Sequence, residues 1–136
     1  EALKIAEENG QNLKITDRVE WRQGDYLKAF DEEDIFDGIF SNPPYIPTKD
    51  IGGLSREVKH EPRLALDGGT DGLYFYHLLA KGAAEHLKPG GFLAVEFGIG
   101  QATDILEMFR KSAQYEDFEV IKDYGGIERA LYCRKK

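Results

Sequence analysis

The chain has 136 residues, 41% of them hydrophobic, which is enough for a single domain with a real core. Its 25 acidic residues outnumber its 18 basic ones, and the formal charge of −7 argues against a surface built mainly to bind nucleic-acid phosphates. The single cysteine, Cys133, provides no internal disulfide and favours a reducing compartment such as the cytoplasm. We detect no signal peptide, and no apolar run approaches the length of a membrane span.

The first elements are a helix and a strand. Residues 1–8 carry apolar side chains on one side, and Asn9 and Gly10 are typical of a helix end. We expect a strand around residues 19–21, a turn or short helix at 24–27, and a solvated loop in the acidic run 31–34. Because the sequence begins with Glu1 inside a helix, we expect the chain to be a piece of a longer protein.

The most informative stretch is IFDGIFSNPPY, residues 35–45. Its first half is a short apolar run, typical of a strand buried on both faces of a parallel sheet. Pro43 and Pro44 cannot continue that strand, and each forces the residue before it into an extended conformation. The result is a stiff loop at the carboxyl end of a parallel strand, where open α/β sheets bind their ligands.

This loop is rich in hydrogen-bond acceptors. The Asn42 side-chain oxygen and the Pro43 carbonyl oxygen are suited to the two N–H groups of a planar amide or amino group, with the ring of Tyr45 lying against its plane. The alternative is a Pro-Pro turn in which Asn42 caps the end of the strand, since Asn-Pro pairs are common turn signals.

The rest of the chain alternates helices and strands. We expect a long irregular segment from residue 46 to about residue 70, which at that length favours a functional or mobile loop. A helix capped by Thr70 or Asp71 should then run to residue 87 and end at the Lys-Pro-Gly-Gly of residues 88–91. A strand at 92–97, a helix at 102–109 and two antiparallel strands at 118–122 and 129–134 complete an α/β pattern.

Two motifs together resemble one enzyme family. Asn-Pro-Pro-Tyr after a hydrophobic strand resembles the substrate motif of S-adenosylmethionine-dependent methyltransferases that act on planar nitrogen. The segment EPRLALDGGTDGL, residues 61–73, resembles the signature that follows it in protein-(glutamine-N5) methyltransferases of the HemK/PrmC family. Those enzymes methylate the glutamine of the Gly-Gly-Gln motif of peptide chain release factors. Asn-Pro-Pro-Tyr is also shared with adenine-N6 methyltransferases acting on DNA or RNA, and a catalytically inactive fragment is a third alternative.

The resemblance implies a fold. It is the class I, Rossmann-like methyltransferase fold with the strand order 3-2-1-4-5-7-6, and residues 1–136 correspond to a partial catalytic domain with strands three to seven. The first two strands and the glycine-rich loop, which hold most of the cofactor, are missing from this mapping. Unpaired strand edges and an exposed apolar face should follow, with rearranged edges or self-association as the consequence.

The resemblance also implies a cofactor and partners. The cofactor is S-adenosylmethionine, with Asp25, Tyr26 and Asn42 as cofactor-binding residues, of which Asp25 and Tyr26 are adenine contacts. From the residues alone, we favour a helix cap for Asp25 and a partly exposed core aromatic for Tyr26. The catalytic residues are Asn42 and Pro43, and Pro44 and Tyr45 join them in binding the substrate. The expected partners are release factors, without a membrane and without direct nucleic-acid binding.

Other candidate sites are weaker. Gly98 and Gly100 flank a loop that is either a cofactor cradle or a closely packed strand-to-helix turn. His60, His77 and His86 show no metal-ligand spacing, so we expect no metal and no nucleophile with a histidine base. We interpret Glu61 as an anchor for backbone donors in the loop.

Overall fold

The computed structural model describes residues 1–56 and 58–136, apart from the side chain of Lys59. The chain divides into two units, Glu1–Glu32 and Glu33–Lys136, which are described separately. Within these described residues, every helix is too short or too polar to span a lipid bilayer.

The first unit contains the helix α1 (Ala2–Asn12) and the 3₁₀ turn η1 (Tyr26–Ala29). The predicted helix end at Asn9 and Gly10 is wrong, because α1 continues to Asn12. Gly10 is buried for another reason: a Cβ atom there would lie 2.4 Å from the ring of Trp21. The glycine therefore makes room for the indole ring that packs on the helix.

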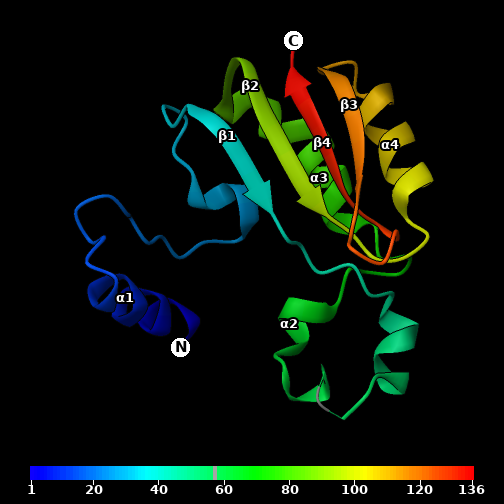
Figure 1. Ribbon diagram of the computed structural model, residues 1–136, viewed down its shortest axis with the longest axis horizontal. Helices are drawn as coiled ribbons and strands as arrows, with labels where there is room; N and C mark the ends of the chain where they lie inside the picture. Colours follow the sequence, from blue (N-terminus) through cyan, green and yellow to red (C-terminus); the bar gives the residue numbers. More distant parts are fainter. Residues whose placement is uncertain (57) are drawn as a thin grey trace. The chain divides into compact units, whose positions relative to one another are not determined.

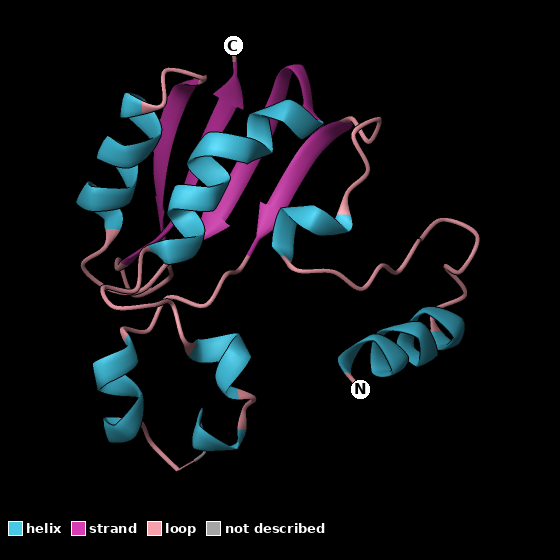
Figure 2. Ribbon diagram, turned by 180° about the vertical axis from the view of Figure 1, so that it is seen from behind, coloured by secondary structure: helices cyan, strands magenta, loops and turns pink. Residues whose placement is uncertain are grey.

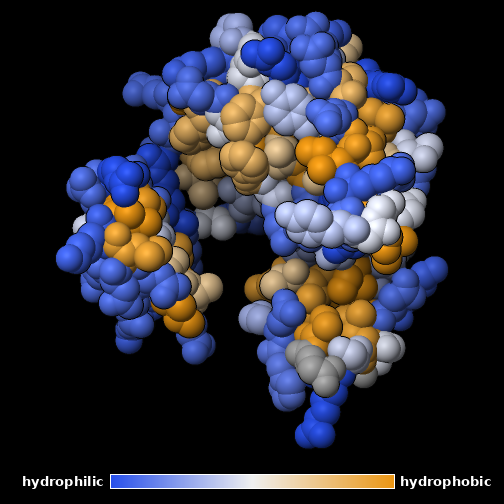
Figure 3. Space-filling model, viewed as in Figure 1, coloured by the Kyte–Doolittle hydropathy of each residue, from blue (hydrophilic) through white to orange (hydrophobic). Residues whose placement is uncertain are grey.

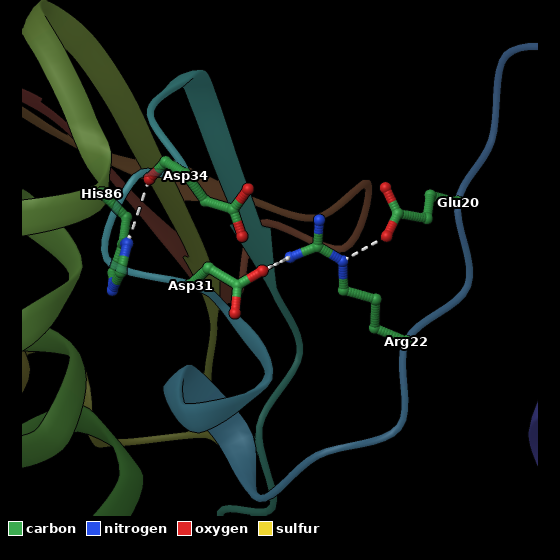
Figure 4. A network of polar contacts seen from close by, with 5 residues as sticks. All are labelled: Glu20, Arg22, Asp31, Asp34 and His86. Carbon is green, nitrogen blue, oxygen red and sulfur yellow. Dashed lines mark hydrogen bonds and ion pairs between the residues drawn. The ribbon is translucent and has the colours of Figure 1, made fainter.

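The predicted strand at residues 19–21 is also wrong. A strand requires a neighbour for its ladder hydrogen bonds, and no described segment pairs with these residues. Arg22 forms ion pairs with Glu20 and with Asp31, as Figure 4 shows. The acidic run 31–34 is a loop, as predicted.

The second unit is built on a four-stranded sheet with the order β1-β2-β4-β3. Strand β1 (Phe36–Ser41) is parallel to β2 (Leu87–Glu96), whereas β4 (Glu128–Lys135) is antiparallel to both β2 and β3 (Tyr115–Lys122). This is the order 4-5-7-6 expected from the resemblance. The α/β prediction and the antiparallel pair at the end of the chain are confirmed.

Helices cover one face of this sheet. Helix α3 (Tyr74–Gly82) continues into the 3₁₀ turn η4 (Ala83–His86), and with α4 (Ala102–Lys111) it lies across the face seen in Figure 2. The core between helices and strands is closely packed and apolar, and its fully buried large residues include Tyr76, Leu79, Leu93, Val95, Ile105, Phe109 and Leu131.

The third helix differs from its prediction at both ends. It begins at Tyr74, and the Asp71 carboxylate accepts a hydrogen bond from the Leu73 N–H at 2.9 Å, so Asp71 rather than Thr70 supports its start. The prediction that the helix reaches residue 87 is wrong, because Leu87 already pairs with Phe36 in the sheet. The preceding His86 contacts the Asp34 carbonyl oxygen at 3.1 Å through Nδ1, which fastens the chain ahead of β1 (Figure 4).

None of the second unit's described helices covers the other face of the sheet (Figure 1). Phe40, Phe92 and Tyr132, on adjacent strands, form a row of aromatic rings that we call the aromatic row. Phe40 and Phe92 meet edge to face with centroids 5.1 Å apart, and Phe92 stacks on Tyr132 at 5.7 Å. Phe40 is 79% exposed, and Figure 3 shows apolar surface over these strands. The expected exposed apolar face is therefore present in this unit.

Candidate active site

The Asn-Pro-Pro-Tyr loop lies at the carboxyl end of β1, beside the carboxyl end of the parallel strand β2. Pro43 is buried, Pro44 and Tyr45 are half-buried, and Asn42 is exposed. In the described part of the chain, no residue forms a hydrogen bond with the Asn42 side chain. The alternative in which Asn42 caps the strand is therefore not supported, and its amide is available to a ligand.

Beside this loop lies a cavity of about 430 Å³. Asn42, Pro43 and Tyr45 line one side of it. The opposite side comes from residues 54–66, and its lining side chains are Leu54, Val58, Glu61, Ala65 and Leu66. The cavity is thus bounded on one side by a loop whose Asn42 and Pro43 oxygens accept no hydrogen bond from the described residues, and on the other by a mostly apolar surface.

Residues 46–69, here called the insertion, form this opposite side. The prediction of an irregular segment is wrong: it contains the short helices η2 (Thr48–Gly53), η3 (Val58–His60) and α2 (Arg63–Leu66). Pro47 and Pro62 stand at the N-cap positions of η2 and α2, where a missing N–H and a fixed φ help to start a turn.

The two ends of the insertion are joined by a set of hydrogen bonds that we call the clasp. The Ile46 N–H donates to the Leu66 carbonyl at 3.0 Å, and the Thr48 N–H donates to the Gly69 carbonyl at 2.9 Å. The Asp67 carboxylate accepts from the Thr48 hydroxyl at 2.6 Å and from the Gly69 N–H at 3.1 Å. These two donors, with Arg63, hold the pKa of Asp67 below its usual value.

Tyr45 is oriented from the side of the sheet. Its hydroxyl lies 3.5 Å from Arg129 Nη2, and the same nitrogen lies 3.7 Å from a carboxylate oxygen of Glu96. Asp123 lies in the turn between β3 and β4, where its carboxylate accepts hydrogen bonds from the N–H groups of Gly125 and Ile127.

The other predicted site residues have different surroundings. Asp25 and Tyr26 lie in the first unit, where Asp25 forms an exposed ion pair with Lys28 at 2.7 Å and no side-chain cap, so its role towards a cofactor stays a prediction. Tyr26 is half-buried with a φ of +59°. The prediction for Glu61 is wrong among the described residues, because its carboxylate bonds no backbone donor there and lines the cavity.

The remaining polar groups do not form a second catalytic cluster. Across residues 1–56 and 58–136, no three His, Cys, Asp or Glu side chains gather closely enough to hold a metal ion. Cys133 is buried in β4, and burial raises its pKa to about 12, so it stays a neutral thiol. Sequence reasoning missed Leu54 and Val58, whose only signal was their apolar character within a polar segment.

Comparisons with known proteins identify the class first. The chain resembles a methyltransferase from Pyrococcus furiosus with a TM-score of 0.69 and 25% identity, covering 98% of this chain and 57% of that one. It resembles TrmN from Thermus thermophilus in fold alone, with a TM-score of 0.60, 17% identity, and 98% and 33% of the two chains covered. The chain therefore has part of the class I methyltransferase fold. No family model matches the chain.

The particular relatives are release factor glutamine methyltransferases. That of Moorella thermoacetica is 42% identical over 135 residues, which cover 99% of this chain and 47% of the relative. That of Bradyrhizobium diazoefficiens is 45% identical over 135 residues, covering 98% and 45%. The resemblance to protein-(glutamine-N5) methyltransferases is confirmed along almost the whole chain, which spans about half the length of the curated relatives it matches.

Proposed function

We propose that this chain is the amide-binding part of an enzyme that transfers a methyl group from S-adenosylmethionine to the glutamine side-chain nitrogen in the Gly-Gly-Gln motif of peptide chain release factors. The observation that carries the proposal is Asn42, whose side-chain amide bonds to no described residue and lies at the carboxyl end of a parallel strand beside the 430 Å³ cavity. The family resemblance over both motifs supports the substrate.

The chemistry follows from the weakness of an amide nitrogen as a nucleophile, since its lone pair is delocalised into the carbonyl group. The Asn42 oxygen and the Pro43 carbonyl oxygen accept its two N–H groups, orient them, and stabilise the positive charge that grows on the nitrogen during transfer. No base strong enough to deprotonate the neutral amide is required, because the methylated nitrogen carries a positive charge, is strongly acidic and releases its proton to water. Tyr45 lies against the plane of the amide.

The methyl group itself comes from S-adenosylmethionine, and the chain fits only part of that cofactor. Asp25 and Tyr26 would hold the adenine, with Asn42 close to the reacting centre. The loop at Gly98 does not fit a cofactor cradle: its N–H donates to Gln101 Oε1 at 2.8 Å, and a Cβ there would lie 3.0 Å from the Tyr45 ring. The close contacts of Gly98 support the alternative, a strand-to-helix turn, and we expect the isolated chain to be inactive.

The partners that we propose are release factors in the cytoplasm, without a membrane or a direct nucleic-acid contact. Adenine methylation is disfavoured by the net charge of −7 and by the lining of the cavity, where none of the described side chains is basic. For the isolated chain we propose self-association through the aromatic row.

The test replaces the matching segment of the Moorella thermoacetica relative with this chain and supplies the hybrid with a release factor and labelled S-adenosylmethionine. We expect methylation of the glutamine, located by mass spectrometry, and cofactor binding by calorimetry to the hybrid but not to the isolated chain. The substitution Asn42→Ala should reduce kcat by about 100-fold or more, while Asn9→Ala in α1 serves as the matched control. A folded Asn42→Ala hybrid with normal turnover contradicts the role of Asn42, and methylation of DNA instead of the release factor contradicts the substrate.

A further inference from the structure

Gln101 occupies the N-cap position of α4 without capping it. Its side chain makes no hydrogen bond to the first turn of the helix, where Ser, Thr, Asp or Asn would be favoured. Instead Oε1 accepts the Gly98 N–H at 2.8 Å, while Nε2 donates to the Tyr45 carbonyl at 3.1 Å and to the Gly72 carbonyl at 3.3 Å. One side chain therefore joins the loops after β1 and β2 to the segment before α3.

The hydrogen bond from Gln101 to Tyr45 supplies a donor to a loop in which two prolines lack the backbone N–H. Pro43 and Pro44 have no N–H, so the loop offers carbonyl acceptors and few donors of its own. Hydrogen bonds to the carbonyl groups of this loop must therefore come from donors elsewhere in the fold. The Gln101 amide is such a donor, and it reaches the Tyr45 carbonyl from 56 residues away.

Three glycines bring the loops close enough for this contact. A Cβ at Gly72 would lie 2.3 Å from the Tyr45 carbonyl oxygen, and one at Gly68 would lie 2.8 Å from the Pro44 carbonyl oxygen. A Cβ at Gly98 would lie 3.0 Å from both the Tyr45 ring and Gln101 Oε1. The backbone of Pro44 and Tyr45 is thus enclosed at van der Waals distance on several sides.

Gln101 lies outside the 430 Å³ cavity. Tyr45 and Ile46 border the 430 Å³ cavity and also a second hollow of about 340 Å³. Gln101 lines only the second hollow, whereas Asn42 and Pro43 line only the first. The side chain therefore touches the backbone that carries the acceptors and not the space in front of them.

We propose that Gln101 is the positioning residue of this site: its amide fixes the backbone at Tyr45 so that Asn42 and the Pro43 carbonyl present two acceptors at a set separation. This inference rests on the proposed function. A displacement of about 1 Å in such an arrangement can reduce the rate by about 100-fold.

The test is Gln101→Glu in the hybrid enzyme. The substitution keeps the shape and the acceptor for Gly98 but turns an oxygen towards the carbonyls of Tyr45 and Gly72. We expect kcat to fall by about 100-fold. The KM for the release factor should be almost unchanged, because the contacts between the enzyme and the release factor outside the amide site remain.

The chain offers a matched control in Gln114. Its Nε2 also donates to two carbonyl oxygens, those of Ala80 and Lys81, both at 3.2 Å, at the other end of α3. Gln114→Glu makes the same chemical change outside the site and should leave kcat unchanged. Equal losses of kcat in both variants, or wild-type kcat in Gln101→Glu, would overturn the proposal.

Lowering the pH should partly restore the activity of Gln101→Glu, an effect that general destabilisation of the fold would not produce. A protonated carboxyl at position 101 regains a donor, so the deficit of Gln101→Glu should narrow as the pH falls, while Gln101→Leu stays impaired. A constant deficit over the same pH range would also count against the proposal.

Hydrogen exchange in the 136-residue chain gives a readout that is independent of activity. The Gly98 N–H should stay protected in Gln101→Glu and lose protection in Gln101→Leu, and the Ile46 N–H should exchange faster in both. Unchanged exchange at Ile46 overturns the positioning role. An inactive hybrid without substitutions contradicts the proposed function, and exchange still decides whether Gln101 holds the loop.

Discussion

Replacing Gly72 by alanine should damage the site through one contact. Gly72 has a φ of +78°, and an added Cβ would lie 2.3 Å from the Tyr45 carbonyl oxygen and 2.9 Å from Gln101 Nε2. Gly126 has nearly the same φ, +80°, but nothing lies within 4 Å of an added Cβ. Comparing Gly72→Ala with Gly126→Ala therefore separates the free-energy cost of a left-handed backbone conformation from the cost of the steric contact with Tyr45.

The magnitudes follow from these two costs. A left-handed conformation costs an L-residue about 1–2 kcal/mol, and both variants incur it. Forcing an atom into a filled space costs about 1–3 kcal/mol more, and only Gly72→Ala incurs that. At about 4 °C per kcal/mol for a chain of this size, Gly126→Ala should lower Tm by about 4–8 °C and Gly72→Ala by about 8–20 °C.

Far-UV circular dichroism during thermal and urea unfolding measures both free energies in the 136-residue chain. The m-value should stay constant, since neither change alters the surface exposed on unfolding. If both variants lose the same free energy of unfolding, the Tyr45 carbonyl oxygen does not lie at contact distance from the Gly72 backbone, and the reasoning is refuted.

Three further predictions concern the core and the clasp. Tyr76 is fully buried and its hydroxyl donates to the Glu96 carbonyl at 2.7 Å, so Tyr76→Phe should lower the free energy of unfolding by about 1 kcal/mol in urea titrations, and a change near zero would mean that water replaces the hydroxyl. Cys133 is 1% exposed with its pKa raised to about 12, so a thiol reagent should modify it only as fast as the chain opens, and rapid labelling under native conditions would contradict the burial. Because the pKa of Asp67 is lowered in the folded chain, the stabilisation by its carboxylate is complete above the unfolded pKa of about 3.9 and is lost as the pH falls through the folded pKa. The difference in free energy of unfolding between wild type and Asp67→Asn should therefore shrink in acid. A difference that does not depend on pH would show that the carboxylate charge does not stabilise the fold.

Local patterns predicted most of the sheet. Apolar runs of strand length and a Gly-Gly turn were enough for β1, for the second half of β2 and for the β3–β4 pair. The first half of β2 was missed, because residues 88–91 were expected to end a helix. The strand around Val19 failed because pairing is not a local property: the residues have strand character, but no described neighbour completes a ladder.

The supporting contacts were beyond the reach of pattern reading. Gln101 reaches partners 29 and 56 residues away, and nothing in its immediate sequence indicates them. Gly10 shows the opposite failure, since a glycine near a helix end suggested termination but is required by the Trp21 ring. The prolines that begin the short helices of the insertion were visible signals that the prediction of an irregular segment overlooked.

The clasp has a consequence for substitutions in the insertion. Because Ile46 and Asp67 pair directly and Thr48 bonds to Gly69, the insertion begins and ends at almost the same point, between the loop after β1 and the segment before α3. Its interior can then change in length and composition without moving the strands or the acceptor loop. A change in the lining residues of this segment would therefore alter the cavity beside Asn42 without altering the loop that carries the proposed acceptors.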